Sequence, residues 1–253
     1  MKVTFLGTGT SQGVPVPMCD CKVCRSTDHR DQRLRCSVYI EYQGKDIIID
    51  TGPDFRQQLL REKIMHIDGI LFTHSHHDHI AGLDDVRCFN FKYKKPIGIY
   101  TSAAVEQRLR EVFSYIFSEV QYPGAPQVYI TRIKDKVFSV KGVEITPLQV
   151  LHGKLPIFGF RIGDFTYLTD TSFIPESENE KIQGSKVIVL DALRQTPHPT
   201  HLHLDAAIDI IKKFQPQKAY FIHMSHQMGL HDEIEKLLPE NMHLAYDGLK
   251  IEV

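Results

Sequence analysis

The sequence predicts an α/β fold in a single domain of 253 residues, a length that one α/β fold commonly reaches. Apolar residues make up 42% of the chain and charged residues 24%, which are ordinary globular values and exclude disordered and fibrous classes. The last third alternates short apolar runs with helix-like stretches. No linker or low-complexity segment interrupts the chain, so residues 1–253 are assigned to one domain.

The charge balance gives no global argument for nucleic-acid binding, because 30 basic residues face 31 acidic ones. A small basic stretch, Lys92, Lys94 and Lys95, is interpreted as a solvated loop rather than a phosphate-binding surface. The first residues, 1–6, predict a strand rather than a signal peptide. No apolar stretch approaches the roughly 20 residues that span a bilayer. We therefore expect a cytoplasmic location and no membrane partner.

The first half of the chain predicts a strand at 3–6 that leads into the loop 7–13. This loop is rich in small residues but lacks the spacing of a nucleotide-binding motif. β-Branched and aromatic runs on either side of 43–45 predict a hairpin. Further strands are predicted at 37–42, 46–50 and 97–100, and helices at 54–61, 83–90 and 102–117.

The second half predicts a series of short strands followed by alternating strands and helices. Strands are expected at 128–133, 137–140, 143–149, 159–162, 165–168, 186–190 and 218–222, helices at 202–214 and 232–238, and a closing strand at 243–253.

A cluster of imidazoles follows the apolar run 70–72, where four of the fourteen histidines lie within six positions. Imidazole and carboxylate are ligands that divalent metals prefer. His74 and His76 alternate along an extended segment, so both can bind one ion. Asp78 and His79 begin the next element and can reach a second ion. The pattern predicts half of a metal site.

Polar residues at other strand ends can complete a two-ion site. His152, Asp170 and His223 each follow a predicted strand. Asp50 also ends a strand, and it is interpreted as a residue that orients a ligating histidine.

Three cysteines lie close together in a loop at about 15–25. An odd total of five cysteines favours thiols or metal ligands over disulfides. Cys19, Cys21 and Cys24 are interpreted as three ligands of a tetrahedral zinc site that needs a fourth ligand from elsewhere. Cys36 and Cys88 are interpreted as small apolar residues.

The signature Thr73-His74-x-His76-x-Asp78-His79-x-x-Gly82, together with the later ligands, resembles the metallo-β-lactamase superfamily. The resemblance implies a four-layer αβ/βα sandwich with a dinuclear site, holding zinc or manganese, where the two sheets meet. It implies that one ion is held by His74, His76 and His152, the other by Asp78, His79 and His223, and that Asp170 bridges them.

The cysteine loop and the segment His223-x-x-His226-Gln227 resemble more closely the cyclic-phosphate phosphodiesterases of the bacterial phosphonate pathway. This resemblance implies a structural zinc held by the three cysteines and His226. It also makes His203 the candidate general acid, with His198 and His201 as nearby competitors. Asp78 and His203 are the candidate catalytic residues.

The predicted function is hydrolysis of a small cyclic phosphate, such as ribose 1,2-cyclic phosphate, by a metal-activated water. The expected partner is a small phosphodiester, and a homodimer is left open. One alternative is tRNA 3′-end processing or another nuclease activity, which is not favoured because the basic stretch is short. Another is a non-hydrolytic zinc scaffold or carrier protein.

Overall fold

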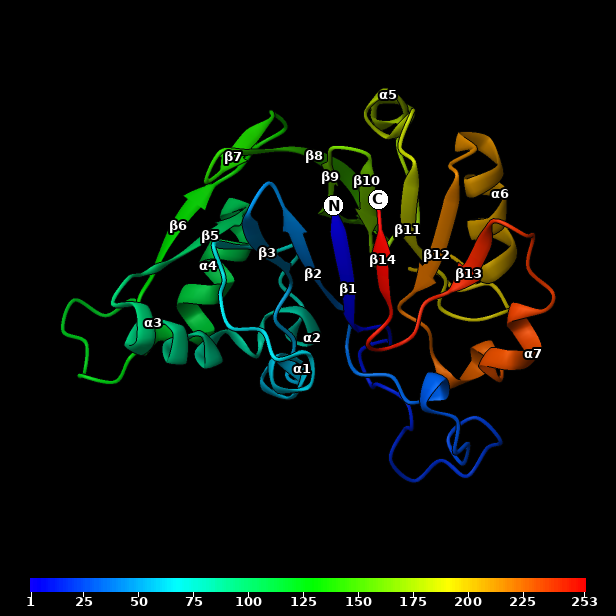
Figure 1. Ribbon diagram of the computed structural model, residues 1–253, viewed down its shortest axis with the longest axis horizontal. Helices are drawn as coiled ribbons and strands as arrows, with labels where there is room; N and C mark the ends of the chain where they lie inside the picture. The colour runs from blue at the N-terminus through cyan, green and yellow to red at the C-terminus, as the bar shows by residue number, and fades with distance from the viewer.

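The computed structural model describes residues 1–253, which form two seven-stranded sheets packed face to face (Figure 1). The first sheet has the order β14 (Lys250–Glu252), β1 (Lys2–Gly7), β2 (Ser37–Tyr42), β3 (Lys45–Ile49), β4 (Gly69–Leu71), β5 (Ile97–Thr101) and β6 (Val128–Arg132). The second has the order β13 (Met242–Leu244), β12 (Lys218–Ile222), β11 (Val187–Asp191), β10 (Phe165–Leu168), β9 (Leu155–Ile162), β8 (Val143–His152) and β7 (Phe138–Val140).

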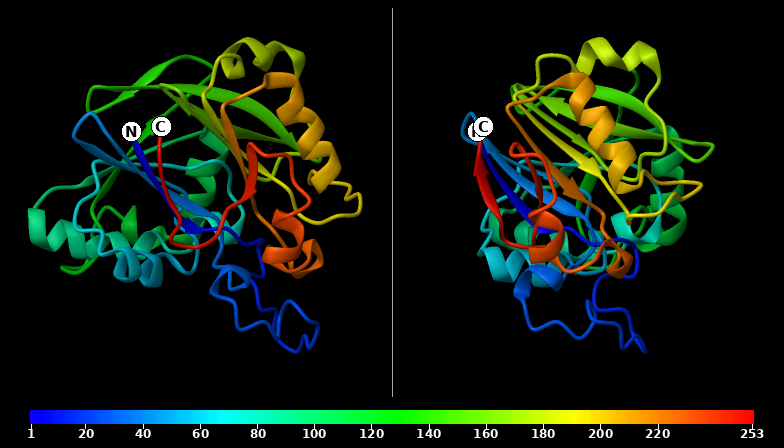
Figure 2. Two further views of the ribbon diagram at one scale, coloured as in Figure 1. Left: turned by 45° about the vertical axis from the view of Figure 1, so that its right-hand side comes forward. Right: turned by 90° about the vertical axis from the view of Figure 1, so that its right-hand side faces the viewer.

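Helices cover the outer face of each sheet, as the two further views in Figure 2 show. The α-helices are α1 (Phe55–Glu62), α2 (His77–Ile80), α3 (Arg87–Tyr93), α4 (Ala103–Val112), α5 (Asn179–Ile182), α6 (Leu204–Phe214) and α7 (His231–Glu235). The 3-10 turns are η1 (His29–Asp31), η2 (Leu83–Val86), η3 (Ser114–Ile116), η4 (Glu176–Glu178) and η5 (His226–Met228). None of these helices is long and apolar enough to cross a membrane.

Three apolar layers hold the sandwich together. The middle layer lies between the sheets and includes Phe5 and Tyr167, which are fully buried. A second layer packs the first sheet against α1, α3 and α4, and a third packs the other sheet against α6. The predicted four-layer αβ/βα sandwich is therefore confirmed.

Parallel strands at the centre of each sheet place their carboxyl ends at one edge. In the first sheet β3, β4 and β5 run parallel, and in the second β10, β11 and β12 do. Two backbone hydrogen bonds join the two edges across the sandwich. The Thr10 amide donates to the Met224 carbonyl oxygen at 3.0 Å, and the Met224 amide donates to the Thr8 carbonyl oxygen at 3.0 Å. Loops from six strands can therefore meet at this junction.

The predicted closing strand at 243–253 is wrong, because the chain forms two strands that belong to different sheets. β13 pairs with β12, whereas β14 pairs with β1. Between them Gly248 adopts a φ of +88°, and Asp247 accepts hydrogen bonds from the amides of Thr8 and Leu34. These contacts, which are distant in sequence, turn the chain from one sheet to the other.

The predicted helix at 83–90 is divided into η2 and α3, and the predicted helix at 102–117 ends as α4 at Val112 before η3. Strands β8 and β9 extend further than predicted and meet in a hairpin at His152 and Leu155.

Replacing Gly82 with alanine should destabilise the fold. A Cβ at Gly82 would lie 2.2 Å from the Gly52 carbonyl oxygen and 2.6 Å from the Phe55 Cβ. We expect Gly82→Ala to lower the free energy of unfolding by about 1–3 kcal/mol, measured by denaturant titration. Gly124→Ala is the control, because its Cβ would approach only the exposed ring of Tyr122. Equal stability of the two variants would contradict the predicted close approach.

Candidate metal centre

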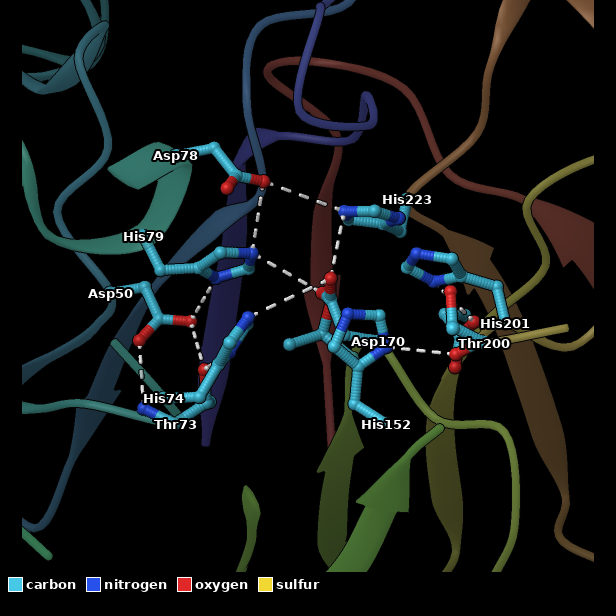
Figure 3. A network of polar contacts seen from close by, with 12 residues as sticks. Asp50, Thr73, His74, Asp78, His79, His152, Asp170, Thr200, His201 and His223 are labelled. Atoms are coloured by element: carbon cyan, nitrogen blue, oxygen red, sulfur yellow. Dashed lines mark hydrogen bonds and ion pairs between the residues drawn. The ribbon is translucent and has the colours of Figure 1, made fainter. Parts of the chain in front are cut away.

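The seven predicted active-site ligands converge in two groups at the junction of the sheets, and Figure 3 labels all of them except His76. Within each group the ligand atoms lie within 4.8 Å of one another, and Asp170 belongs to both groups. One group contains His74, His76, His152 and Asp170, and the other contains Asp78, His79, Asp170 and His223. The grouping matches the division that the superfamily resemblance implies.

Sharp backbone turns direct several side chains into this junction. Asp50, Asp170 and His223 follow β3, β10 and β12, and their φ angles are 62°, 55° and 58°. Left-handed backbone is unfavourable for residues with a side chain and costs about 1–3 kcal/mol at each position. The surrounding contacts therefore hold these residues in orientations that the chain would not adopt alone.

Asp50 organises the first group of loops from a fully buried position. Its carboxylate accepts hydrogen bonds from the Thr73 amide at 2.9 Å and from the Thr73 hydroxyl at 2.7 Å. His79 Nδ1 lies 2.7 Å from Asp50 Oδ2 and donates to it. His79 Nε2 is thereby left with its lone pair directed into the junction, which supports the predicted orienting role of Asp50.

Two other histidines are oriented in the same way. His74 Nδ1 lies 3.0 Å from the Thr73 hydroxyl oxygen, which can accept its hydrogen bond. His152 Nδ1 donates to the Thr200 carbonyl oxygen at 2.8 Å. Each contact leaves Nε2 as the ligating atom.

The buried ring nitrogens that face the junction have no hydrogen-bond partner. They are Nε2 of His74, Nε2 of His79 and both nitrogens of His223. A buried polar atom without a partner is unfavourable, and bound cations would remove that penalty at the Nε2 atoms of the three histidines.

The charges at the junction favour a cation. Burial opposes ionisation of Asp78 and Asp170, yet the neighbouring histidines His79 and His223 lower the pKa of each carboxyl group below its ordinary value. Burial lowers the pKa of His74 well below its ordinary value, so this imidazole is neutral. Despite burial, Asp170 and Asp78 raise the pKa of His79 and His223. Ionised carboxylates that attract protons to neighbouring imidazoles form a donor set in which a divalent ion would take the place of those protons.

His201, and not His203, contacts the predicted ligands. The His201 ring stacks on that of His223, with centroids 4.8 Å apart and planes at 16°, and its centroid lies 4.5 Å from that of His152. His203 instead occupies the position before the first residue of α6 and belongs to neither ligand group. The His198 ring lies next to the His201 ring, with centroids 5.2 Å apart. His201, which the sequence analysis names as a competitor of His203, therefore lies against the predicted ligands, and the identity of the general acid stays a prediction.

Asp191 was not identified from the sequence, although it ends β11 at the same edge of the sheet. One oxygen accepts a hydrogen bond from the Thr171 amide at 2.6 Å, and the other lies 3.7 Å from His201 Nδ1. Burial raises the pKa of Asp191 to about 8 and lowers that of His201 to about 3. The available signal was a carboxylate at a strand end, which Asp191 shares with Asp50 and Asp170.

The cysteine loop meets His226 as the closer resemblance implied. Nδ1 of His226 lies 3.1 Å from the Sγ of Cys19, 3.4 Å from that of Cys21 and 3.5 Å from that of Cys24. A hydrogen bond from the Cys24 amide lowers the pKa of Cys21 to about 6. Three thiols and one imidazole within bonding reach of a common point fit a tetrahedral zinc ion.

Comparison with known proteins defines the class. Residues 45–224 match the model of the Beta-lactamase superfamily domain, so the chain belongs to that superfamily. It is a metal-dependent hydrolase with the metallo-β-lactamase fold.

A closer relationship places this hydrolase in the PhnP type. The crystal structure of a new diphosphatase from the PhnP family is 44% identical, with a TM-score of 0.93, and the alignment covers 100% of this chain and 97% of that one. The octanoyltransferase of Porphyromonas gingivalis is 39% identical over 253 residues, which cover 99% of this chain and 51% of that protein. The ribonuclease Z of Methanococcus maripaludis is 24% identical over 156 residues, 60% of this chain and 46% of that protein. The matches to these two proteins span about half of each.

Loss of the Asp50 carboxylate should weaken metal binding without removing a ligand. We expect Asp50→Asn to lower the affinity for the active-site ions by about 10–100-fold, because His79 and Thr73 lose their shared acceptor. Competition with a chelator measures the affinity. Asp209→Asn, at an exposed position of α6 that belongs to no ligand group, is the control and should bind metal as the unmodified protein does. Similar affinities for both variants would contradict the orienting role.

Loss of one cysteine should remove one metal ion per chain. We expect Cys24→Ser to lose the zinc of the cysteine loop while both active-site ions remain, as measured by elemental analysis of the purified protein. Cys36→Ser is the control, because Cys36 is buried between the sheets and belongs to no ligand group. Unchanged metal content in Cys24→Ser would show that the loop holds no zinc.

Proposed function

We propose that the protein is a metal-dependent phosphodiesterase that hydrolyses small phosphodiesters, with a ribose cyclic phosphate as the first candidate substrate. The observation that carries the proposal is the pair of ligand groups that share buried Asp170, with a further histidine, His201, beside them. Two cations held close together suit in-line displacement at phosphorus. The PhnP-family diphosphatase and the ribonuclease Z relatives support chemistry at phosphorus.

The seven ligands would hold two divalent ions, zinc or manganese, and a zinc would occupy the cysteine loop. Three imidazole nitrogens at the first position suit zinc, whereas the more carboxylate-rich second position also accepts manganese. When bound, the active-site ions lower the pKa of a water and neutralise charge on the phosphoryl oxygens. Asp50 and Thr200 keep His79 and His152 oriented through this chemistry.

His201 is the proposed general acid. Its ring lies between those of His152 and His223, so it adjoins both ligand groups. As the bond from phosphorus to the leaving oxygen breaks, that oxygen takes the electron pair of the bond and the proton from His201 Nε2. The Asp191 carboxyl group, which burial keeps protonated, gives a proton to His201 Nδ1, so the ring stays neutral.

Hydrolysis of a diphosphate is a second candidate, favoured by the 44% identity with the PhnP-family diphosphatase over 97% of that protein. Nuclease activity has less support, because Lys92, Lys94 and Lys95 lie at the end of α3 on the outer layer of helices, where a long basic arm is not formed. Acyl transfer is not proposed, since the octanoyltransferase match covers about half of that protein.

The test is a panel of ribose cyclic phosphates, bis(p-nitrophenyl) phosphate, nucleoside diphosphates and a tRNA precursor, each with Zn²⁺ or Mn²⁺. Turnover of the cyclic phosphates or the synthetic diester supports the proposal. Turnover of nucleoside diphosphates alone would replace it with a diphosphatase, and turnover of RNA alone with a nuclease. No turnover, with metal bound only in the cysteine loop, would favour a scaffold.

His76 and His77 should differ sharply although they are neighbours. His76 belongs to the first ligand group, whereas His77 begins α2 and belongs to none. We expect His76→Ala to lower kcat/KM on bis(p-nitrophenyl) phosphate by at least about 10²-fold and His77→Ala to change it little. Equal losses would mean that the ligand assignment is wrong.

His201 and His203 also provide a matched pair. We expect His201→Ala to lower kcat on substrates with an alcohol leaving group by about 10²–10⁴-fold, the usual contribution of a general acid. His203→Ala should retain most activity, because His203 belongs to neither ligand group. The reverse order would restore His203 as the general acid.

A further inference from the structure

A polar cleft of about 430 Å³ opens between the base of the cysteine loop, α1 and the turn that precedes β14. None of the seven active-site ligands lines it, and none of the four residues of the cysteine site does. Asp247 is the one carboxylate in its wall. Most of the polar side chains that line the cleft are instead hydrogen-bond donors, namely Arg33, Arg35, Arg61, Gln12, Gln32 and Gln57.

Arg33 is a buried positive charge in the wall of this cleft, and it is only 5% exposed. Its guanidinium group donates to the Thr8 hydroxyl oxygen at 2.9 Å, to the Ala245 carbonyl oxygen at 2.6 Å and to His231 Nδ1 at 3.2 Å. Burial lowers the pKa of His231 to about 4, so all three acceptors are uncharged. No carboxylate forms an ion pair with Arg33, and its Nε–H group has no partner. Buried charges are seldom left in this state.

The nearby carboxylate of Asp247 compensates Arg33 only at one remove. The Thr8 hydroxyl group lies between them, because it accepts from Arg33 and donates to Asp247 at 2.8 Å. Both oxygens of Asp247 are already bound by donors from Thr8, Leu34 and Arg61. Burial lowers the pKa of Arg33 to about 10 despite its attraction to Asp247. An anion in the cleft would give Arg33 the direct partner that the chain does not supply.

Arg35 and two glutamine side chains offer further donors to the same cleft. Asp54 binds Nη1 of Arg35 at 3.1 Å, and Nε donates to the Ser11 carbonyl oxygen, which leaves Nη2 without a partner. Gln12 and Gln57 are exposed, and their side-chain amides form no hydrogen bond within the chain. Guanidinium and amide groups arranged around one space suit the oxygens of a phosphate group.

We propose that the polar cleft binds a phosphate group, free or carried by a small organic molecule, with Arg33 Nε and Arg35 Nη2 as the charged donors. The cleft falls within the range of small-molecule sites, about 300–1,000 Å³, so it can hold more than phosphate alone. Gln12 and Gln57 would then face the rest of the ligand. This site is separate from the metal centre and does not depend on the proposed phosphodiesterase function.

Hydrogen bonds connect the cleft with the segment that presents His223. Thr8 accepts from Arg33 through its hydroxyl oxygen, and its carbonyl oxygen accepts the Met224 amide hydrogen at 3.0 Å. Met224 follows His223 directly. A ligand bound to Arg33 would therefore restrain the loop after β1, which both the cleft and the metal centre contact.

The experiment titrates the metal-loaded protein with inorganic phosphate or ribose 5-phosphate and records the ¹⁵Nε–¹Hε resonances of Arg33 and Arg35. We expect both resonances to shift saturably with a Kd below about 1 mM. The same shifts should occur in His76→Ala, which lacks a ligand of the metal centre. Tighter binding of ribose 5-phosphate would identify an organic phosphate as the ligand, and equal affinities would identify phosphate itself. No shift, or equal shifts with chloride, would overturn the proposal.

A charge added at the rim tests the site without disturbing its buried contacts. Gln57 is exposed on α1, and we expect Gln57→Glu to raise the Kd for phosphate by about tenfold or more through repulsion. Gln107→Glu is the matched control, because it makes the same charge change at an exposed position of α4 outside the cleft. An unchanged Kd in Gln57→Glu, or equal increases in both variants, would overturn the proposal.

The charged donors are tested by changing Arg35. We expect Arg35→Gln to raise the Kd for phosphate by about tenfold or more and Arg35→Lys, which keeps the charge but loses the planar donor group, to recover part of that loss. Thermal denaturation monitored by circular dichroism shows whether each variant folds. A folded Arg35→Gln variant that binds phosphate as tightly as the unmodified protein would overturn the proposal. If Arg35→Gln does not fold, the comparison of Gln57→Glu with Gln107→Glu decides.

Discussion

The structure depends on one buried negative charge, the carboxylate of Asp170, at the junction of the two sheets. Its side chain is 3% exposed and lies 3.2 Å from Nε2 of both His79 and His223. A buried carboxylate is strongly unfavourable unless cationic or hydrogen-bonding groups compensate for it. The first sheet contributes His79, and the second contributes Asp170 and His223. The two sheets must therefore pack in one register for the charge to be stabilised.

Strand geometry makes this convergence possible. The chain leaves β3, β10 and β12 at the same edge and turns sharply through left-handed residues, so that short side chains reach a common point. Each of these left-handed turns is strained. The packed sheets and the close packing of Gly52 against Gly82 hold the turns in place. Rigid strands thus hold the donor atoms before any ion binds, which is the condition for tight and selective coordination.

A short segment of the chain, 223–226, joins the cysteine loop to this centre. His223 faces Asp170, and His226, three residues later, faces the three cysteines. Met224 follows His223 directly. Its amide donates to the Thr8 carbonyl oxygen and its carbonyl oxygen accepts from the Thr10 amide, both in the loop after β1 of the first sheet. A zinc in the loop would therefore restrain the segment that presents His223, and the loop, which projects from the end of the sandwich, acts through that one segment (Figure 1).

The sequence alone predicted most of the strands and helices and the seven residues that the structure brings together in the two ligand groups, because the information is local. His74, His76, Asp78 and His79 lie within six positions, and the other ligands each follow an apolar strand. Only the tertiary structure distinguishes the surroundings of His201 from those of His203, since these depend on where α6 begins and on contacts with His152 and His223. The division of the last strand likewise depends on Asp247 binding Thr8, a residue 239 positions away. The contact of Asp191 with His201 was not predicted because the path of the loop that carries His201 follows from packing and not from periodicity.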